Sequence, residues 1–184
     1  TGSYNDFGAF KDLLRKNYIG KEVYNERFKD FLVSQEAAKG NAYYVFGFVD
    51  DENLDSNNRL GALNLGYKIP FETKKHSQDQ IEKILLGGLG TYGLNPDFSI
   101  NIASESHLSR FKKLVDLLDE HNGKFDREGF ASAPYVKLMV AWATKEEKLV
   151  KKTISENPNF LTYVKNNIWA KGYSDSLTDY FHHD

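Results

Sequence analysis

Apolar side chains recur every three to four residues in the first forty positions of the chain, with charged residues between them. This spacing stacks side chains on one helical face, so it predicts two helices on either side of Gly20, which we interpret as a helix stop. The apolar positions are Phe7, Phe10, Leu14 and Tyr18 in the first helix and Tyr24, Phe28, Phe31 and Leu32 in the second. Residues 5–39 are therefore predicted to form an αα-hairpin.

The pattern becomes that of β-structure between residues 42 and 69. Residues 42–49 are rich in aromatic and β-branched side chains and too few for a typical helix, which indicates a largely buried strand. From residue 60 to residue 69, apolar side chains alternate with smaller or polar ones, as on a strand with one buried face. The apolar positions of this alternation are Leu63, Leu65, Tyr67 and Ile69. We therefore expect a β-hairpin over residues 42–69, with the polar residues 50–59 as its loop.

A third strand is predicted over residues 98–102, where apolar and polar side chains again alternate. Before this strand, Ser77 can cap a short helix over residues 78–86, and the glycine-rich residues 87–93 follow as a connection. Three strands suffice for a small sheet. The predicted fold class is α+β, with a small three-stranded, mostly antiparallel sheet packed against a predominantly helical body.

The C-terminal half, residues 104–172, has the apolar periodicity of helices. Pro134 stands at the first position of an apolar segment that we expect to be the central buried helix. In the tail, residues 173–184, apolar side chains have helical spacing and would pack on the chain's own domain or bind a protein partner. These side chains are Tyr173, Leu177, Tyr180 and Phe181. Because the N-terminal portion has only a small sheet, one joint core is expected, and residues 1–184 are interpreted as a single globular domain.

The composition excludes several classes of protein. The 184 residues include 24 Lys and Arg against 26 Asp and Glu, and the formal charge of −2 leaves no basic face for DNA or RNA. The absence of cysteine excludes disulfides, thiolate catalysis and cysteine-ligated metal centres. The longest apolar run, residues 42–49, is far shorter than the roughly 20 residues of a membrane span. The sequence does not indicate a compartment.

The acidic loop that follows residue 49 is the candidate metal site. Asp50, Asp51 and Asp55 lie among Glu, Asn and Ser residues, and Ca²⁺ takes six to eight oxygen ligands of these kinds. The spacing does not match an EF-hand, and polar hairpin loops of this length are commonly only solvated. We therefore expect no cofactor, with Ca²⁺ as the one ion that the loop could hold.

Three other segments resemble known sites without completing them. Residues 119–130 resemble a calcium loop around Asn122-Gly123, but the first and last ligands of such a loop are missing. The glycine-rich residues 87–93 follow a predicted helix, so no helix N-terminus points at a bound phosphate. Residues 104–107 combine Ser, Glu and His107, the residue types of a hydrolytic triad, but Ser and Glu are also the expected caps of a helix.

These patterns favour a non-catalytic protein-interaction or structural subunit with an unidentified protein partner. The chain is rich in side chains that pack and poor in recognisable reactive groups. The alternative is a small hydrolase whose acids and histidine come together only in three dimensions.

Overall fold

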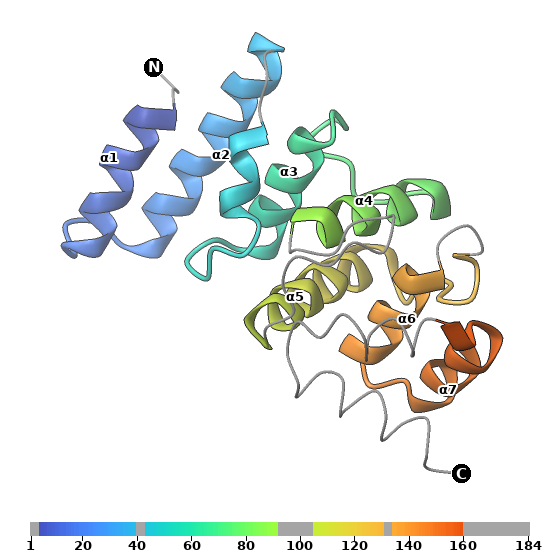
Figure 1. Ribbon diagram of the computed structural model, residues 1–184. Helices are drawn as coiled ribbons and strands as arrows, with labels where there is room; N and C mark the ends of the chain where they lie inside the picture. Colours follow the sequence, from blue (N-terminus) through green and yellow to red (C-terminus); the bar gives the residue numbers. More distant parts are fainter. Residues whose placement is uncertain (1–3, 40–42, 92–104, 131–133, 160–184) are drawn as a thin grey trace. The chain divides into compact units, whose positions relative to one another are not determined.

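The computed structural model describes residues 4–39, 43–91, 105–130 and 134–159 (Figure 1). The chain divides into two compact units, which we call unit 1 (Thr1–Lys75) and unit 2 (His76–Asp184). The expected single domain over residues 1–184 stays a prediction. The tail that carries Tyr173, Leu177, Tyr180 and Phe181 lies outside the described residues.

Unit 1 is built from helices around a cluster of aromatic rings. Its helices are α1 (Tyr4–Arg15), α2 (Lys21–Ala38), the 3₁₀ helix η1 (Tyr43–Phe48) and α3 (Ser56–Gly66). α2 packs against α1 and α3, and α3 packs against η1. The ring of Phe7 in α1 lies 5.1–5.4 Å from four other rings, which belong to Tyr24, Phe28, Phe31 and Phe48. The apolar stripes that predicted the first two helices are thus confirmed, because they supply most of this cluster.

The predicted α+β fold is wrong. The described part of the chain contains seven α-helices and one 3₁₀ helix and no strand, and residues 42–69, expected to be a β-hairpin, contribute η1 and α3 instead. The third strand, predicted over residues 98–102, lies outside the described residues.

α3 was mistaken for a strand because it is buried along most of its length. Residues 60–65 are all buried, so neither a helical nor a strand period separates inside from outside. The alternation over Leu63, Leu65, Tyr67 and Ile69 arises because large and small residues follow one another in this buried segment. The helix begins at Asp55, whose carboxylate accepts a hydrogen bond from the backbone N–H of Asn58 at 2.8 Å. Such an N-cap satisfies a backbone donor that has no partner inside the helix.

Small residues allow the helices of each unit to approach closely. A Cβ atom at Gly66 would overlap the ring of Phe46 from η1, and one at Gly88 in α4 would lie 2.6 Å from Cδ2 of Leu114 in α5. These glycines therefore serve packing. Gly88, expected in a connection after residue 86, lies inside a helix that continues to Thr91.

In the described residues, α1, α3 and α6 are each followed by a left-handed residue other than glycine. Asn17, Lys68 and Lys145 have φ angles of 61°, 60° and 58°. After α3, the N–H of Lys68 donates to the carbonyl of Leu65 at 3.0 Å, and the N–H of the next residue donates to the carbonyl of Asn64 at 2.8 Å. These bonds satisfy carbonyls that the helix leaves unpaired, as in a Schellman motif.

The interpretation of Gly20 as the stop of the first helix is also wrong. α1 ends at Arg15, with Asn17 in the left-handed position, and Gly20 is the N-cap residue of α2. Asn is the residue other than glycine that most readily takes this conformation, so the stop signal was present three residues earlier.

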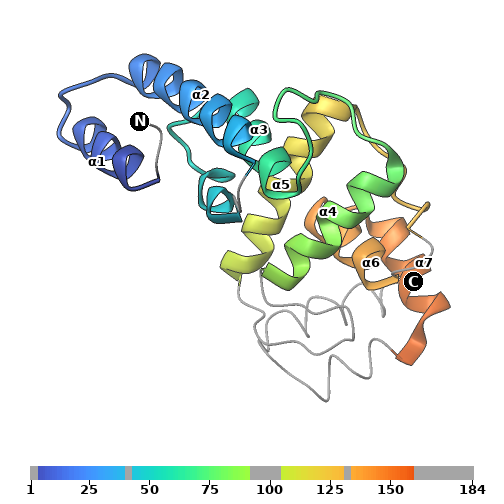
Figure 2. The same cartoon turned by 90° about the horizontal axis from the view of Figure 1, so that it is seen from above.

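Unit 2 is a bundle around one apolar helix. Its helices are α4 (Gln78–Thr91), α5 (Glu105–Asn122), α6 (Pro134–Ala143) and α7 (Glu147–Glu156). α6 contacts α4, α5 and α7, and Figures 1 and 2 both place α4, α5 and α6 side by side. Residues 138–143 of α6 are all buried, which confirms α6 as the central buried helix of this unit. Among the described residues, no helix has the length and apolar character needed to cross a membrane.

Replacing Gly66 by alanine tests the close approach of α3 and η1. We expect Gly66→Ala to lower the free energy of unfolding by about 1–3 kcal/mol, because the added methyl group overlaps the Phe46 ring. The matched control is Gly8→Ala in α1, where nothing lies within 4 Å of the added atom and stability should rise by up to about 1 kcal/mol. Denaturant unfolding of both variants measures the difference. Equal effects at the two positions would contradict the packing role of Gly66.

Candidate functional site

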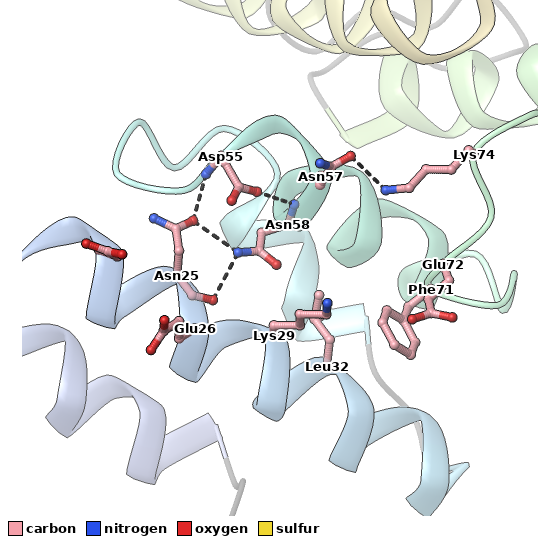
Figure 3. A pocket seen from close by; sticks show the side chains of 11 residues that line it. Asn25, Glu26, Lys29, Leu32, Asp55, Asn57, Asn58, Phe71, Glu72 and Lys74 are labelled. Atoms are coloured by element: carbon pink, nitrogen blue, oxygen red, sulfur yellow. Dashed lines mark hydrogen bonds between the residues drawn. The ribbon is translucent and has the colours of Figure 1, made fainter.

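The surface of unit 1 holds an open groove of about 740 Å³. One wall is α2, and the other is formed by the start of α3 and by the segment 71–74 that follows it (Figure 3). The lining residues are Glu22, Asn25, Glu26, Lys29 and Leu32 on α2 and Asp55, Asn57, Asn58, Phe71, Glu72 and Lys74 on the opposite side. We call this hollow the α2–α3 groove.

Amide side chains join the two walls at one end of the groove. The side-chain oxygen of Asn25 accepts hydrogen bonds from the backbone N–H of Asp55 at 2.8 Å and from Nδ2 of Asn58 at 3.0 Å (Figure 3). The side-chain nitrogen of Asn25 donates to the carbonyl of Asn53 at 2.9 Å. Asn58 is 8% exposed and also donates to the backbone carbonyl of Asn25 at 3.1 Å. This end of the groove is therefore held by polar atoms that satisfy one another.

The other end is held in the same way. Asn64 in α3 is fully buried, and its side-chain nitrogen donates to the carbonyl of Thr73 at 2.9 Å and to that of Phe71 at 3.4 Å. A carboxylate oxygen of Glu36 in α2 accepts a hydrogen bond from the backbone N–H of Phe71 at 2.8 Å. The segment 71–73 is thus attached to both helices. The groove is fixed at both ends before any ligand arrives.

Carboxylates outnumber ammonium groups around the groove. The acidic side chains are those of Glu22, Glu26, Asp55 and Glu72, and the basic ones are those of Lys29 and Lys74. All six residues are exposed. The ammonium group of Lys74 donates to the side-chain oxygen of Asn57 at 2.7 Å, which directs it to one end of the groove. Unit 1 as a whole has eleven acidic and eleven basic residues, so the negative excess is local to the groove.

The residues proposed as calcium ligands hold parts of unit 1 together. One oxygen of Asp51 accepts a hydrogen bond from the hydroxyl of Tyr24 at 2.7 Å and lies 3.5 Å from the ammonium group of Lys11, and the other accepts the N–H of Asn53 at 2.9 Å. Asp55 caps α3, and Asp50 is half-buried directly after η1. Among the described residues, no three His, Asp or Glu side chains are grouped as ligands for a metal.

Burial dominates the environment of Tyr24. Its phenol is enclosed in the aromatic cluster, and this burial raises the pKa of the Tyr24 hydroxyl, with the hydrogen bond to Asp51 and the charge of Asp51 acting in the same direction. The hydroxyl therefore stays protonated and serves as a permanent donor to Asp51.

Unit 2 has a second hollow, of about 890 Å³, between residues 124–128 and the start of α7. Three ion pairs join charged side chains of this hollow: Lys124 with Glu146 at 3.0 Å, Lys151 with Glu147 at 3.3 Å and Lys152 with Glu128 at 3.0 Å. These pairs engage three of the four lysines that line the hollow.

A buried arginine lies below this second hollow. Arg127 is 5% exposed, and its guanidinium donates to both oxygens of Asp119 at 2.8 and 2.6 Å and to Glu146 at 3.1 Å. The ring of Phe125 lies 4.1 Å from the guanidinium carbon. Residues 119–130, which resemble a calcium loop in sequence, are thus organised around an internal cation.

Glu146 shows how this cluster balances its charges. Burial alone would raise the pKa of Glu146, but the hydrogen bonds from Thr144, Lys124 and Arg127, together with the charge of Arg127, outweigh it and lower that pKa. The carboxylate therefore stays charged in the folded protein.

His76 and the predicted candidate His107 both belong to unit 2. The ring nitrogen Nδ1 of His76 lies 3.2 Å from the side-chain oxygen of Asn122, which also accepts the backbone N–H of His76 at 2.6 Å. Burial lowers the pKa of the His76 imidazole. His107 lies in α5, but its side chain is outside the described part, as is Ser104.

The amide residues that hold the α2–α3 groove were missed by sequence reasoning. Asn25 falls among the polar positions of an amphipathic helix, and Asn64 falls inside the supposed strand. Among these residues, only the N-cap could have been predicted from the sequence, because Asp is a preferred N-cap residue and Asp55 lies shortly before an apolar segment.

Calcium tests the two interpretations of the acidic loop. We expect millimolar Ca²⁺ to leave the melting temperature unchanged, because protein donors already occupy the carboxylates of Asp51 and Asp55. Tyr24→Phe should lower the free energy of unfolding by about 1 kcal/mol with or without calcium, since it removes one hydrogen bond. A calcium-dependent rise in melting temperature that disappears in Asp51→Ala would show instead that the loop binds the ion.

The pH dependence of stability tests the role of Glu146. Its folded-state pKa is lower than its unfolded-state pKa of about 4.3, so its contribution is complete above that value and is lost as the pH falls through the folded-state pKa. The stability difference between the wild type and Glu146→Gln should therefore be largest near neutral pH and shrink below about pH 4.3. The control is Glu147→Gln, because the Glu147 side chain is 58% exposed. This substitution should change the free energy of unfolding little. Denaturant unfolding at several pH values gives the comparison, and a gap that widens in acid would contradict it.

Comparisons of the chain with protein-family models, with curated proteins and with solved structures find no match. The α2–α3 groove of unit 1 is the candidate site.

Proposed function

We propose that the protein is a non-catalytic interaction module and that the α2–α3 groove binds a segment of a protein partner. The observation that carries this proposal is the attachment of the groove's walls to each other at both ends, by Asn25 and Asn58 at one end and by Asn64 and Glu36 at the other. A surface that is already ordered loses little conformational entropy when a ligand binds, which favours affinity.

The lining of the groove has the chemistry of a recognition surface. The half-buried Phe71 provides apolar contact area, and the exposed charged side chains surround it. The amides of Asn25 and Asn58 are used in hydrogen bonds to the protein itself, so they act as supports. The volume of about 740 Å³ falls within the range of roughly 300–1,000 Å³ that is usual for binding pockets.

A small hydrolase is the alternative proposal. The groove holds several carboxylates, and pairs of carboxylates carry general acid–base chemistry in some hydrolases. The described residues that line it include neither histidine nor serine. This composition favours binding over a Ser–His type of mechanism in this groove.

Selection from a random peptide library tests the proposal on the full chain. We expect selected peptides to perturb the backbone NMR signals of Asn25, Lys29 and Phe71. Phe71→Ala should weaken their binding about tenfold or more, equivalent to about 1.4 kcal/mol, because it removes apolar contact area. Ile69→Ala is the matched control, since residue 69 is also half-buried but does not line the groove, and it should leave affinity unchanged.

Two results would overturn the interaction proposal. One is a library that yields no binders or binders that perturb signals only outside the groove. The other is turnover of a chromogenic ester, phosphate or glycoside that disappears in Glu26→Gln, which would assign the groove to a hydrolase. Thermal unfolding of each variant shows whether it keeps the fold.

A further inference from the structure

We infer that the α2–α3 groove selects a positively charged peptide segment with an apolar side chain beside its cations. This inference rests on the proposed function, because it names the class of partner that the same groove binds. The partner's cations would face the carboxylates of the groove, and its apolar side chain would contact the half-buried Phe71.

The groove carries an excess of negative charge. Glu22 and Glu26 lie one helical turn apart on α2, and Glu72 lies on the opposite wall. One of the two ammonium groups, that of Lys74, is directed to the side chain of Asn57. Because unit 1 has equal numbers of acidic and basic residues, this groove departs from its surroundings. A hollow with an excess of one sign of charge attracts ligands of the opposite sign.

The lining of the groove also contains apolar residues. Leu32 is 1% exposed and forms part of the floor, and Phe71 lines the opposite wall. Phe71 is only half-buried, so its ring supplies the apolar area that a ligand in the groove can cover. A partner that carried charge alone would leave the exposed part of this ring in water, so an apolar side chain between or beside the cations uses both features.

The spacing of Glu22 and Glu26 limits how the partner's cations are placed. Residues four apart on a helix are about 6 Å apart along its axis. Cations two residues apart on an extended segment have a similar separation of about 6.6 Å. A segment with two basic residues around one apolar residue therefore matches the groove in an extended conformation.

The second hollow offers a contrast within the same chain. Three of its four lysines, Lys124, Lys151 and Lys152, are each paired with a carboxylate of the protein. A charged ligand there would compete with these pairs. Within the described residues, Glu22 and Glu26 form no such pair.

Three labelled peptides test the inference on the full chain. The probes are GSRLRFSG, the neutral GSQLQFSG and the acidic GSELEFSG, and their affinities are measured by fluorescence anisotropy at about 50 and 300 mM NaCl. We expect the arginine peptide to bind at least tenfold more tightly than the neutral one at low salt and the acidic peptide to bind most weakly. The preference should shrink at high salt, because salt screens the carboxylates.

A charge reversal locates the preference in the groove. Glu26→Lys should reduce the advantage of the arginine peptide at least fivefold. The control, Asp12→Lys on α1, changes the net charge by the same amount at an exposed site outside the groove lining and should leave the preference in place. Both variants are checked for an unchanged circular dichroism spectrum and melting temperature.

The outcomes separate this inference from the proposed function. If the neutral or acidic peptide binds as tightly as the arginine peptide, or if Asp12→Lys acts like Glu26→Lys, the charge selectivity is overturned. In that case the interaction proposal is still judged by whether library peptides map to the groove. If they do not map there, the interaction proposal itself fails.

Discussion

Buried side-chain amides that must be hydrogen-bonded are the constraint on which unit 1 depends. Asn58 and Asn64 are buried in α3, where an amide without a partner would cost about 1–3 kcal/mol. Their partners lie on α2 and in the segment 71–73, so satisfying the amides brings these elements together. The aromatic cluster supplies the apolar area that stabilises the unit, but rings pack in many arrangements. The directional bonds of the amides select one of them and leave a groove between the walls.

Unit 2 meets the same requirement with charge. Arg127 is buried, and its guanidinium is surrounded by Asp119, Glu146 and the ring of Phe125. A buried cation is tolerated only where its donors are satisfied, so residues 119–130 and the start of α7 are arranged around it. The second hollow lies over this cluster, and most of its lysines are paired with carboxylates of the protein. In the α2–α3 groove, by contrast, amides and the carboxylate of Glu36 hold the walls, and the carboxylates of Glu22, Glu26 and Glu72 are exposed. This division of roles is why the two hollows support different proposals.

The sequence determined the helices whose burial is one-sided. Phe7, Tyr24, Phe28 and Phe31 keep helical spacing because each faces the core once per turn, and the structure places their rings in one cluster. The apolar run after Pro134 likewise identified α6 as the buried helix of unit 2. Local rules also explain the cap of α3 at Asp55 and the left-handed residue Asn17 after α1, although the first was assigned to a loop and the second was overlooked.

Only the tertiary structure decided the state of α3 and the existence of the groove. When most positions of a segment are buried, the spacing of its apolar residues no longer distinguishes a helix from a strand. The close contact of Gly66 with Phe46 exists only once α3 is packed against η1. Asn25, Asn58 and Asn64 are ordinary polar residues in the sequence, because an amide shows its role only through the acceptor or donor opposite it. Those partners lie up to 33 residues away along the chain. Amino-acid spacing encodes which face of a helix is apolar, but the pairing of distant polar atoms is set by the folded backbone that brings them within hydrogen-bonding distance.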